Sequence, residues 1–383
     1  MPPILVGLDS DDEDDVNDVP AAVQMQQAFA AAAASEAAAG GSGGGRVEES
    51  FMLSQSGTFK VQDFNINRSG LKAVGPKENS PEAHEQAARS VEISSMTDLE
   101  TMGTLGQGAS GVVFSAKHKL TGEMFAVKEV NVLDKAKRDQ VVAELRIMMT
   151  HTRCPWLVTL YNAFHEEARV YTVLEYMDAG SVADLIEKHR PEGGLRDELW
   201  LAKIATQMLN GISYLHTQLH QVHRDLKPAN VLINSRGAVK ISDFGISSQL
   251  ESTAGLCETF VGTTCYMSPE RLSGTPYSYA ADIWSFGIIM VELVSAEYPY
   301  RAPEGAADSL ISLLSRIMDQ QSPTLPETVT CSDQFAEFTS VCLDKEPARR
   351  PTARDLLRHP FLRAYPIRGD ELLLSGMLEA MSL

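Results

Sequence analysis

The sequence lacks any uninterrupted apolar run close to the roughly 18 residues that a membrane-spanning helix needs. Its first residues, MPPILVGLDSDDEDD, also lack the basic segment and the long apolar stretch of a secretory signal peptide. Both absences argue against a membrane protein and a secreted one. We therefore expect a protein that neither inserts into a bilayer nor leaves the cell.

Cysteine is scarce, and the five cysteines are scattered without the spacing of a metal site. They are Cys154, Cys257, Cys265, Cys331 and Cys342. An odd, irregular set of this kind argues against a disulfide framework and favours a reducing compartment. We expect a cytoplasmic location, with a nuclear one in addition as the alternative.

Positive charge is scarce as well, most of all at the start of the chain. The net charge of the chain is −18, and residues 1–96 hold six Lys/Arg against fifteen Asp/Glu, a net of −9. A surface this acidic repels phosphate backbones and anionic lipids. The balance argues against nucleic acid and membrane surfaces as partners.

Composition divides the chain into three regions. Residues 1–98 include an acidic block and an Ala/Gly-rich run, so most of this extension is expected to be disordered. The stretch FMLSQSGTFKVQDFNINRSGLKAV (51–74) is an exception, because its spaced apolar residues can pair or dock on a folded domain. Regular patterning covers 99–362, and residues 363–383 form a C-terminal tail.

The patterned region changes character along its length. Up to about Val173 the signals are mostly strands with one helix, and after Gly180 they are mostly helical. The helices are expected over 199–217, 280–296, 308–319, 333–343 and 352–358. A strand-rich half followed by a helix-rich half predicts an α+β fold of two lobes.

A glycine-rich stretch, LGQGASGVVFSAKHK, opens the strand-rich half. A β-branched alternating segment follows it rather than a helix, so the glycines are expected in a turn between antiparallel strands, where the backbone can approach phosphates closely. An ordinary glycine-rich hairpin is the alternative. The residues of this glycine loop are Leu105, Gly106, Gln107, Gly108, Ala109, Ser110, Gly111, Val112 and Val113.

Lys128 ends FAVK, seventeen residues after Gly111, and can pair with the α- and β-phosphates of a nucleotide. It then needs a carboxylate to hold it. Val141, Leu145 and Met148 form an apolar helical stripe, and Glu144 lies beside that stripe. We expect Glu144 to turn toward the fold and meet Lys128, although a solvated helix residue is the alternative.

The most specific signal is the catalytic loop, VHRDLKPANVLI (222–233). Asp225 can accept the proton of an attacking hydroxyl, and Lys227 can neutralise the transferring phosphoryl group. Asn230 can bind Mg²⁺, as can Asp243, which opens DFG thirteen residues later. Phosphoryl transfer depends mainly on positioning and charge neutralisation, which these groups supply.

These motifs, in this order, make residues 99–362 resemble a eukaryotic protein kinase domain, which implies a bilobal fold with a small β-rich lobe and a large helical lobe, and ATP and Mg²⁺ as cofactors. The resemblance makes Leu174 the gatekeeper and residues 175–177 the hinge, with Ala126, Glu175 and Met177 contacting the nucleotide. It also implies that Asp282 braces the His-Arg-Asp backbone and that Glu270 pairs with Arg350.

The segment from Asp243 to Glu270 resembles the activation segment of the mitogen-activated protein (MAP) kinase kinases. Thr253 and Thr259 match the spacing Ser/Thr-x₅-Ser/Thr of plant members, and FVGTTCYMSPER is similar to that family too. The resemblance implies a dual-specificity kinase that phosphorylates Thr and Tyr of a MAP kinase and is activated by a MAP kinase kinase kinase at Thr253 and Thr259.

Two alternatives stay open at this point: another serine/threonine kinase of the Ste group, and a pseudokinase that acts as a scaffold. The chain also departs from the family, whose docking motif for the MAP kinase is often an N-terminal basic cluster followed by spaced aliphatic residues. Here no basic cluster precedes the first aliphatic run, and KAVGPK (72–77) is a poor substitute. The amphipathic tail, 369–383, can recruit the upstream kinase or form a helix packed on the second lobe.

Overall fold

A computed structural model of the chain divides it into two units after Gly44, and every described residue belongs to the second unit. The structure describes residues 52–53, 58–61, 63–74, 91–108, 111–150, 154–244, 264–274, 278–302, 309–366, 369 and 373–380. Four predicted site residues lie outside this part of the chain: Ala109, Ser110, Thr253 and Thr259.

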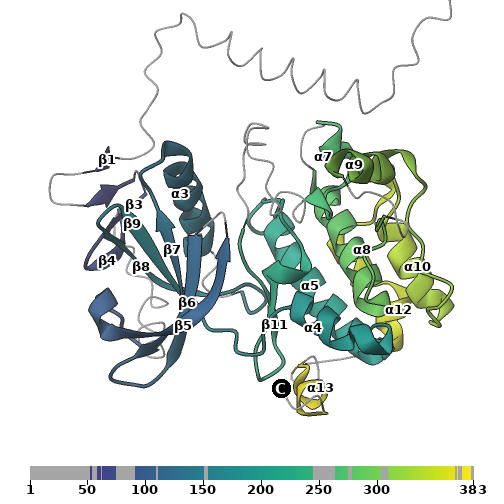
Figure 1. Cartoon of the computed structure of the whole chain (residues 1–383), viewed down its shortest axis with the longest axis horizontal. Coiled ribbons are helices and arrows are strands. Elements are labelled where there is room, and N and C mark those ends of the chain that lie inside the picture. Colours follow the sequence, from purple (N-terminus) through teal and green to yellow (C-terminus); the bar gives the residue numbers. More distant parts are fainter. Residues whose placement is uncertain are drawn as a thin grey trace, which may run out of the picture. The chain divides into compact units, whose positions relative to one another are not determined.

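The first lobe is an antiparallel five-stranded sheet in the order β5-β6-β7-β9-β8 (Figure 1). Its strands are β5 (Leu99–Gly108), β6 (Gly111–His118), β7 (Met124–Asn131), β8 (Leu160–Glu166) and β9 (Arg169–Glu175). Apolar, β-branched and aromatic side chains gather on one face, where Phe125, Val127 and Phe164 are fully buried. Helix α3 (Lys135–Thr150) packs alongside β7.

A second sheet precedes this lobe in the sequence. It has the order β1-β2-β3-β4 and consists of β1 (Met52–Leu53), β2 (Phe59–Lys60), β3 (Phe64–Asn67) and β4 (Gly70–Ala73). Phe59, Phe64 and Ile66 are almost completely buried. The expectation that 51–74 pairs and docks is therefore confirmed for its described residues.

The small sheet docks on β8, the edge strand of the first lobe. Asn162 accepts a hydrogen bond from the Leu71 amide (2.9 Å) and donates one to the carbonyl of Ile93 (2.7 Å). The ring of Phe59 lies 5.7 Å from that of His165, and Asp63 pairs with Arg146 of α3 at 2.8 Å. Covering an edge strand in this way protects it from pairing with another chain.

The second lobe is helical. Its helices are α4 (Val182–His189), α5 (Glu198–Thr217), α7 (Pro269–Leu272), α8 (Tyr279–Ser295), α9 (Leu310–Asp319), α10 (Asp333–Cys342), α11 (Ala353–Leu356) and α12 (Pro360–Ala364). The α+β bilobal prediction is confirmed, as are the five predicted helices, with ends that differ by a few residues. Helix α8 is buried around almost its whole circumference, which makes it the centre of the lobe.

Three helices of this lobe were not predicted: α4, α7 and α12, of which α4 is the longest. The structure shows a complete capping box at the start of α4, in which Ser181 and Asp184 bond each other's backbone amides. Ser-x-x-Asp before an apolar run is a sequence signal for a helix start, so α4 was detectable.

Among the helices that the structure describes, none is long and apolar enough to cross a bilayer.

The tail contains helix α13 (Ser375–Ala380), which contacts the second lobe. Leu374, Met377 and Leu378 are buried, and the Leu374 amide donates to the carbonyl of Gly237 at 2.9 Å. Gly237 lies in the turn between β10 (Val231–Ile233) and β11 (Val239–Ile241). The expectation of a packed C-terminal helix is confirmed, and recruitment of an upstream kinase stays a prediction.

Candidate active site

The glycine loop lies between β5 and β6, as predicted, with Gly106 opposite Val113 and Gly108 opposite Gly111. Gly111 has a φ of +133°, and an added Cβ there would lie 2.1 Å from the carbonyl oxygen of Glu129. Only glycine fits this position without strain. Gly106 and Gly108 are open instead, since a Cβ at either would meet no atom of the described residues within 4 Å. Their backbone is therefore free to approach a ligand.

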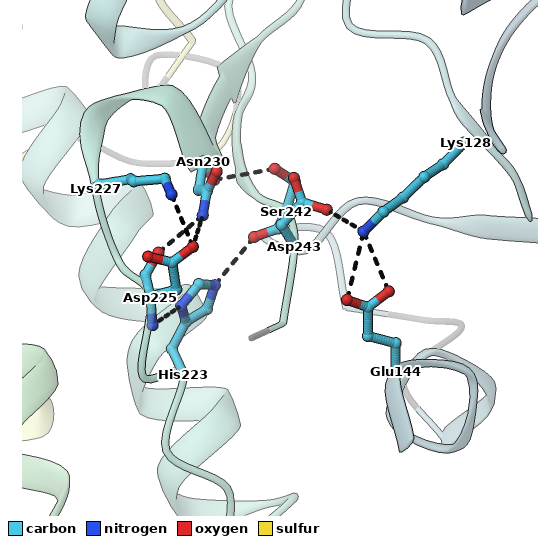
Figure 2. Close-up of polar contacts among 8 residues, drawn as sticks. All are labelled: Lys128, Glu144, His223, Asp225, Lys227, Asn230, Ser242 and Asp243. Atoms are coloured by element: carbon cyan, nitrogen blue, oxygen red, sulfur yellow. Dashed lines mark hydrogen bonds and ion pairs between the residues drawn. The ribbon is translucent and has the colours of Figure 1, made fainter. Parts of the chain in front are cut away.

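Lys128 and Glu144 meet in the interior of the first lobe (Figure 2). The Lys128 ammonium lies 3.1 Å from the Glu144 carboxylate and 2.7 Å from that of Asp243, and only 5% of Lys128 is exposed. Glu144 thus turns inward, as its place beside the apolar stripe of α3 predicted. Ala126 lies two residues before Lys128 on β7, directly opposite Leu174 of β9.

Burial and mutual charge shift the pKa values of Lys128, Glu144 and Asp243. Burial by itself would lower the pKa of Lys128, but Glu144 and Asp243 outweigh burial and raise it. The Lys128 charge holds the pKa of Asp243 below its ordinary value. Burial raises the pKa of Glu144, although Lys128 opposes that shift. Asp243 is therefore ionised at neutral pH and available as a metal ligand.

The catalytic loop gathers the other predicted groups around Asp225 (Figure 2). Lys227 pairs with the Asp225 carboxylate at 2.9 Å, and the Asn230 amide donates to the Asp225 carbonyl (2.8 Å) and carboxylate (3.1 Å). These contacts fix the carboxylate of the predicted base in one orientation. The cation that would neutralise the phosphoryl group lies directly beside it.

His223 connects the catalytic loop to the strand that carries Asp243. Its Nε2 donates to the carbonyl of Ser242 at 3.0 Å, and its Nδ1 accepts from the Asp225 amide at 3.3 Å. Because a carbonyl can only accept, the neutral ring carries its proton on Nε2. The Ser242 amide in turn donates to the carbonyl of Asn230 at 2.9 Å. The base and both predicted metal ligands therefore share one hydrogen-bonded unit.

Asp282 of α8 anchors the backbone of the catalytic loop. It accepts hydrogen bonds from the amides of His223 (2.8 Å) and Arg224 (3.1 Å) and from His216 (2.7 Å), and it is only 1% exposed. Arg224 has a φ of +72°, a left-handed conformation that such surroundings can hold in place. The predicted bracing of the His-Arg-Asp backbone is confirmed.

A second predicted pair ties the end of the activation segment to the lobe. Arg350 donates to both carboxylate oxygens of Glu270, at 2.7 and 2.8 Å. The Arg350 side chain is completely buried, so this two-bond geometry satisfies a charge that water cannot reach. The predicted Glu270–Arg350 contact is confirmed.

The donor set of Asn230 and Asp243 fits a magnesium ion. The amide nitrogen of Asn230 is taken by Asp225, so its carbonyl oxygen is the atom left for a cation. Mg²⁺ prefers oxygen ligands and is usually bound through one or two protein groups plus substrate phosphates. In the described part of the chain no cluster of three or more His, Cys, Asp or Glu could hold a metal alone.

The hinge, 175–177, starts at Glu175, the last residue of β9, and Met177 is 8% exposed. One contact here was not predicted: the Glu175 carboxylate pairs with Lys240 of β11 at 2.7 Å. The direct Lys128–Asp243 pair was also missed. No sequence pattern marks either pair, because their members are 65 and 115 residues apart.

Comparison of the sequence with known proteins points to the same kind of active site as the geometry does. The protein kinase domain family matches residues 99–362. The chain is 41% identical over 323 residues to "Mitogen-activated protein kinase kinase 2" of Arabidopsis thaliana, which covers 84% of this chain and 87% of that protein. It is 38% identical to "Mitogen-activated protein kinase kinase 1c" of Physcomitrium patens, over 82% of this chain and 91% of that protein. The chain therefore belongs to the MAP kinase kinase family of the protein kinase superfamily.

Proposed function

We propose that this protein kinase is a dual-specificity enzyme that transfers the γ-phosphoryl group of ATP to the threonine and the tyrosine in the activation loop of a MAP kinase. The observation that carries the proposal is the assembled unit of Asp225, Lys227, Asn230 and Asp243, with the Lys128–Glu144 pair beside it. Protein kinases use ATP, typically with Mg²⁺. The names of the relatives support a MAP kinase as the substrate.

In this proposal each residue has a separate task. Asp225, oriented by Lys227 and Asn230, accepts the proton of the attacking hydroxyl. Lys227 neutralises the transferring group, and Lys128 orients the α- and β-phosphates while Glu144 holds it. Bound through Asn230 and Asp243, Mg²⁺ would neutralise the phosphate oxygens. The glycine loop, from Leu105 to Val113, covers the phosphates, and the hinge holds adenine through its backbone.

We further propose that phosphorylation of Thr253 and Thr259 by an upstream MAP kinase kinase kinase switches the enzyme on. A phosphate adds about −1.5 to −2 charge and strong acceptor oxygens. Both threonines belong to the segment from Asp243 to Glu270. Lys128 pairs with Asp243 at its start, and Arg350 pairs with Glu270 at its end. Ordering that segment would align Asp243 and open the substrate site. The cytoplasm, with the nucleus in addition, is the proposed location, supported by the scattered cysteines.

The test uses the full chain with Thr253→Glu and Thr259→Glu, Mg-ATP and a catalytically dead MAP kinase, and maps phosphorylated residues by mass spectrometry. Phosphate on both the threonine and the tyrosine of the activation loop is expected. Phosphate only on other serines and threonines would instead indicate a different Ste-group kinase. The Asp225→Asn variant is the negative control.

A separate experiment addresses the switch. The chain with Thr253→Ala and Thr259→Ala is incubated with an upstream MAP kinase kinase kinase, and its activity toward the MAP kinase is compared with that of the treated wild type. Activation is expected in the wild type alone. An equal gain in the double variant would rule out these two threonines as the switch.

A further inference from the structure

A largely buried ion pair connects the hinge to the strand before Asp243. The Lys240 ammonium lies 2.7 Å from the Glu175 carboxylate, and the two side chains are only 12% and 15% exposed. The same carboxylate accepts from the Thr159 amide at 3.3 Å, and the Glu175 amide donates to the Thr159 carbonyl at 2.9 Å. Glu175 is therefore held by two partners. Thr159 bonds it through backbone groups, and Lys240 bonds it through a side chain.

Strand β11, which carries Lys240, is bonded to both lobes. In the second lobe it pairs with β10, where Lys240 lies opposite Leu232. On its other side, the Ile241 amide donates to the carbonyl of Trp156 (2.9 Å), and the Val158 amide donates to the carbonyl of Ile241 (3.0 Å). The segment around Trp156 and Val158 leads directly into β8. Strand β11 therefore joins the hinge side of the first lobe to the second lobe.

The two ends of this connection are the two ends of the proposed nucleotide site. Glu175 begins the hinge, which holds adenine in the proposed function. Asp243 lies three residues after Lys240 and is the proposed metal ligand beside the phosphates. The Ser242 amide bonds the Asn230 carbonyl at 2.9 Å, so any shift of β11 along its axis moves both metal ligands relative to the hinge.

Burial makes this pair different from an ordinary surface pair. Exposed ion pairs contribute little, because water and salt screen them. A charge left alone in a largely buried position is much less favourable, since neither water nor its partner stabilises it. The Arg169–Glu129 pair of the first lobe, with Arg169 50% exposed, represents the exposed kind.

We propose that Lys240 is a positioning residue for the phosphoryl transfer: its ion pair with Glu175 fixes the distance between the adenine end and the metal end of the nucleotide site. The proposal rests on the proposed use of Mg-ATP. A ligand that occupies both ends depends on that fixed distance, whereas a ligand that occupies only the adenine end does not. Lys240 acts through Glu175 and β11, without touching the nucleotide.

The experiment compares two ligands on the full-length chain by isothermal titration calorimetry: adenosine, which occupies the adenine end, and Mg-ADP, which occupies both. In Lys240→Met the affinity for Mg-ADP is expected to fall about tenfold, a size typical of groups coupled through a shared backbone shift, while that for adenosine changes less than about twofold. Glu175→Gln, which keeps the hinge backbone, is expected to show the same selectivity and serves if Lys240→Met folds poorly.

Two control variants separate charge from general disturbance. Lys240→Arg keeps the cation and is expected to retain wild-type affinity for Mg-ADP within about twofold. Arg169→Met removes the cation of the exposed pair and is expected to change neither affinity. Thermal unfolding of each variant confirms that equal amounts of folded protein are compared.

Three results would overturn the inference: an equal loss of affinity for both ligands, which indicates local damage to the hinge; no loss for Mg-ADP; and a loss in Lys240→Arg as large as in Lys240→Met. Failure of the proposed use of Mg-ATP would look different, because the wild-type chain itself would then bind neither adenosine nor Mg-ADP.

Discussion

The glycine loop and the catalytic loop are expected to act on the same phosphates, yet they are built in opposite ways. Every residue of β5 after Leu99 is exposed, and no atom of the described residues lies within 4 Å of where a Cβ of Gly106 or Gly108 would be. In the catalytic loop, His223 and Asn230 are 2% and 5% exposed, and both are hydrogen-bonded.

The difference follows from what each loop presents. A loop that approaches phosphates with its backbone has to be bare, and bare backbone forms few contacts that would fix it. A base and two metal ligands act through side chains, which must be held in one orientation before the reaction. Changes in the catalytic loop should therefore affect chemistry and stability, and changes in the glycine loop should mainly affect nucleotide affinity.

The largest effect is expected at the base. Asp225→Asn keeps the shape of the side chain but cannot accept the substrate proton, so kcat should fall about 10²- to 10⁴-fold. The affinity for Mg-ADP should change far less, because Asn230 and Asp243 remain. Steady-state phosphorylation of a MAP kinase measures the first quantity, and calorimetry measures the second. A variant that kept a tenth of the wild-type kcat would show that Asp225 is not the base.

The anchor below the catalytic loop comes next. Asp282→Ala leaves the amides of His223 and Arg224 and the ring of His216 without their buried acceptor, so unfolding should become easier by about 3–5 kcal/mol. Urea denaturation monitors the change. Asp184→Ala, which removes only a helix-capping contact of α4, is the matched control and should cost about 0.5–2 kcal/mol. Equal costs would mean that the anchor is no stronger than a cap.

A pair of glycine substitutions tests the opposite side of the comparison. Gly111→Ala places a Cβ against the Glu129 carbonyl at a positive φ and should destabilise the chain by about 1–3 kcal/mol. Gly108→Ala meets no atom of the described residues, so stability should change by less than about 0.5 kcal/mol while KM for ATP rises. Thermal unfolding and steady-state kinetics distinguish the two. Equal destabilisation would contradict the open surroundings of Gly108.

The smallest effect concerns acid. Burial by itself would raise the pKa of Glu270, but hydrogen bonds and charge from Arg350 outweigh burial and lower it. A carboxyl group with a lowered pKa in the folded state stabilises the fold above its unfolded pKa of about 4.3, and that stability is lost as the pH falls through the folded pKa. Urea denaturation at pH 6 and at about pH 3.5 should show a smaller acid loss in Glu270→Gln. An unchanged acid loss would mean that Glu270 titrates normally.

Sequence alone gave most of the catalytic loop, because its functional groups lie within a few residues of one another and their spacing reflects one local turn. Glu144 was also predictable, since helical periodicity placed it beside a buried stripe. The contacts of Lys240 and Asn162 were not, because each joins segments that are far apart in the chain. A single lysine or asparagine in a strand carries no pattern that names its partner.

The sheet of residues 52–74 also changes how one stretch of the sequence can be read. KAVGPK, the nearest substitute for a basic docking peptide, starts inside β4: Lys72 lies opposite Asn65, Ala73 opposite Phe64, and the Val74 amide donates to the Asp63 carbonyl at 2.8 Å. A partner that recognises extended peptides would have to compete with β3 for the same backbone groups. The fold therefore occupies the backbone of the first half of this short motif. A partner that binds extended peptides cannot bind that half, and a partner that binds a folded surface still can.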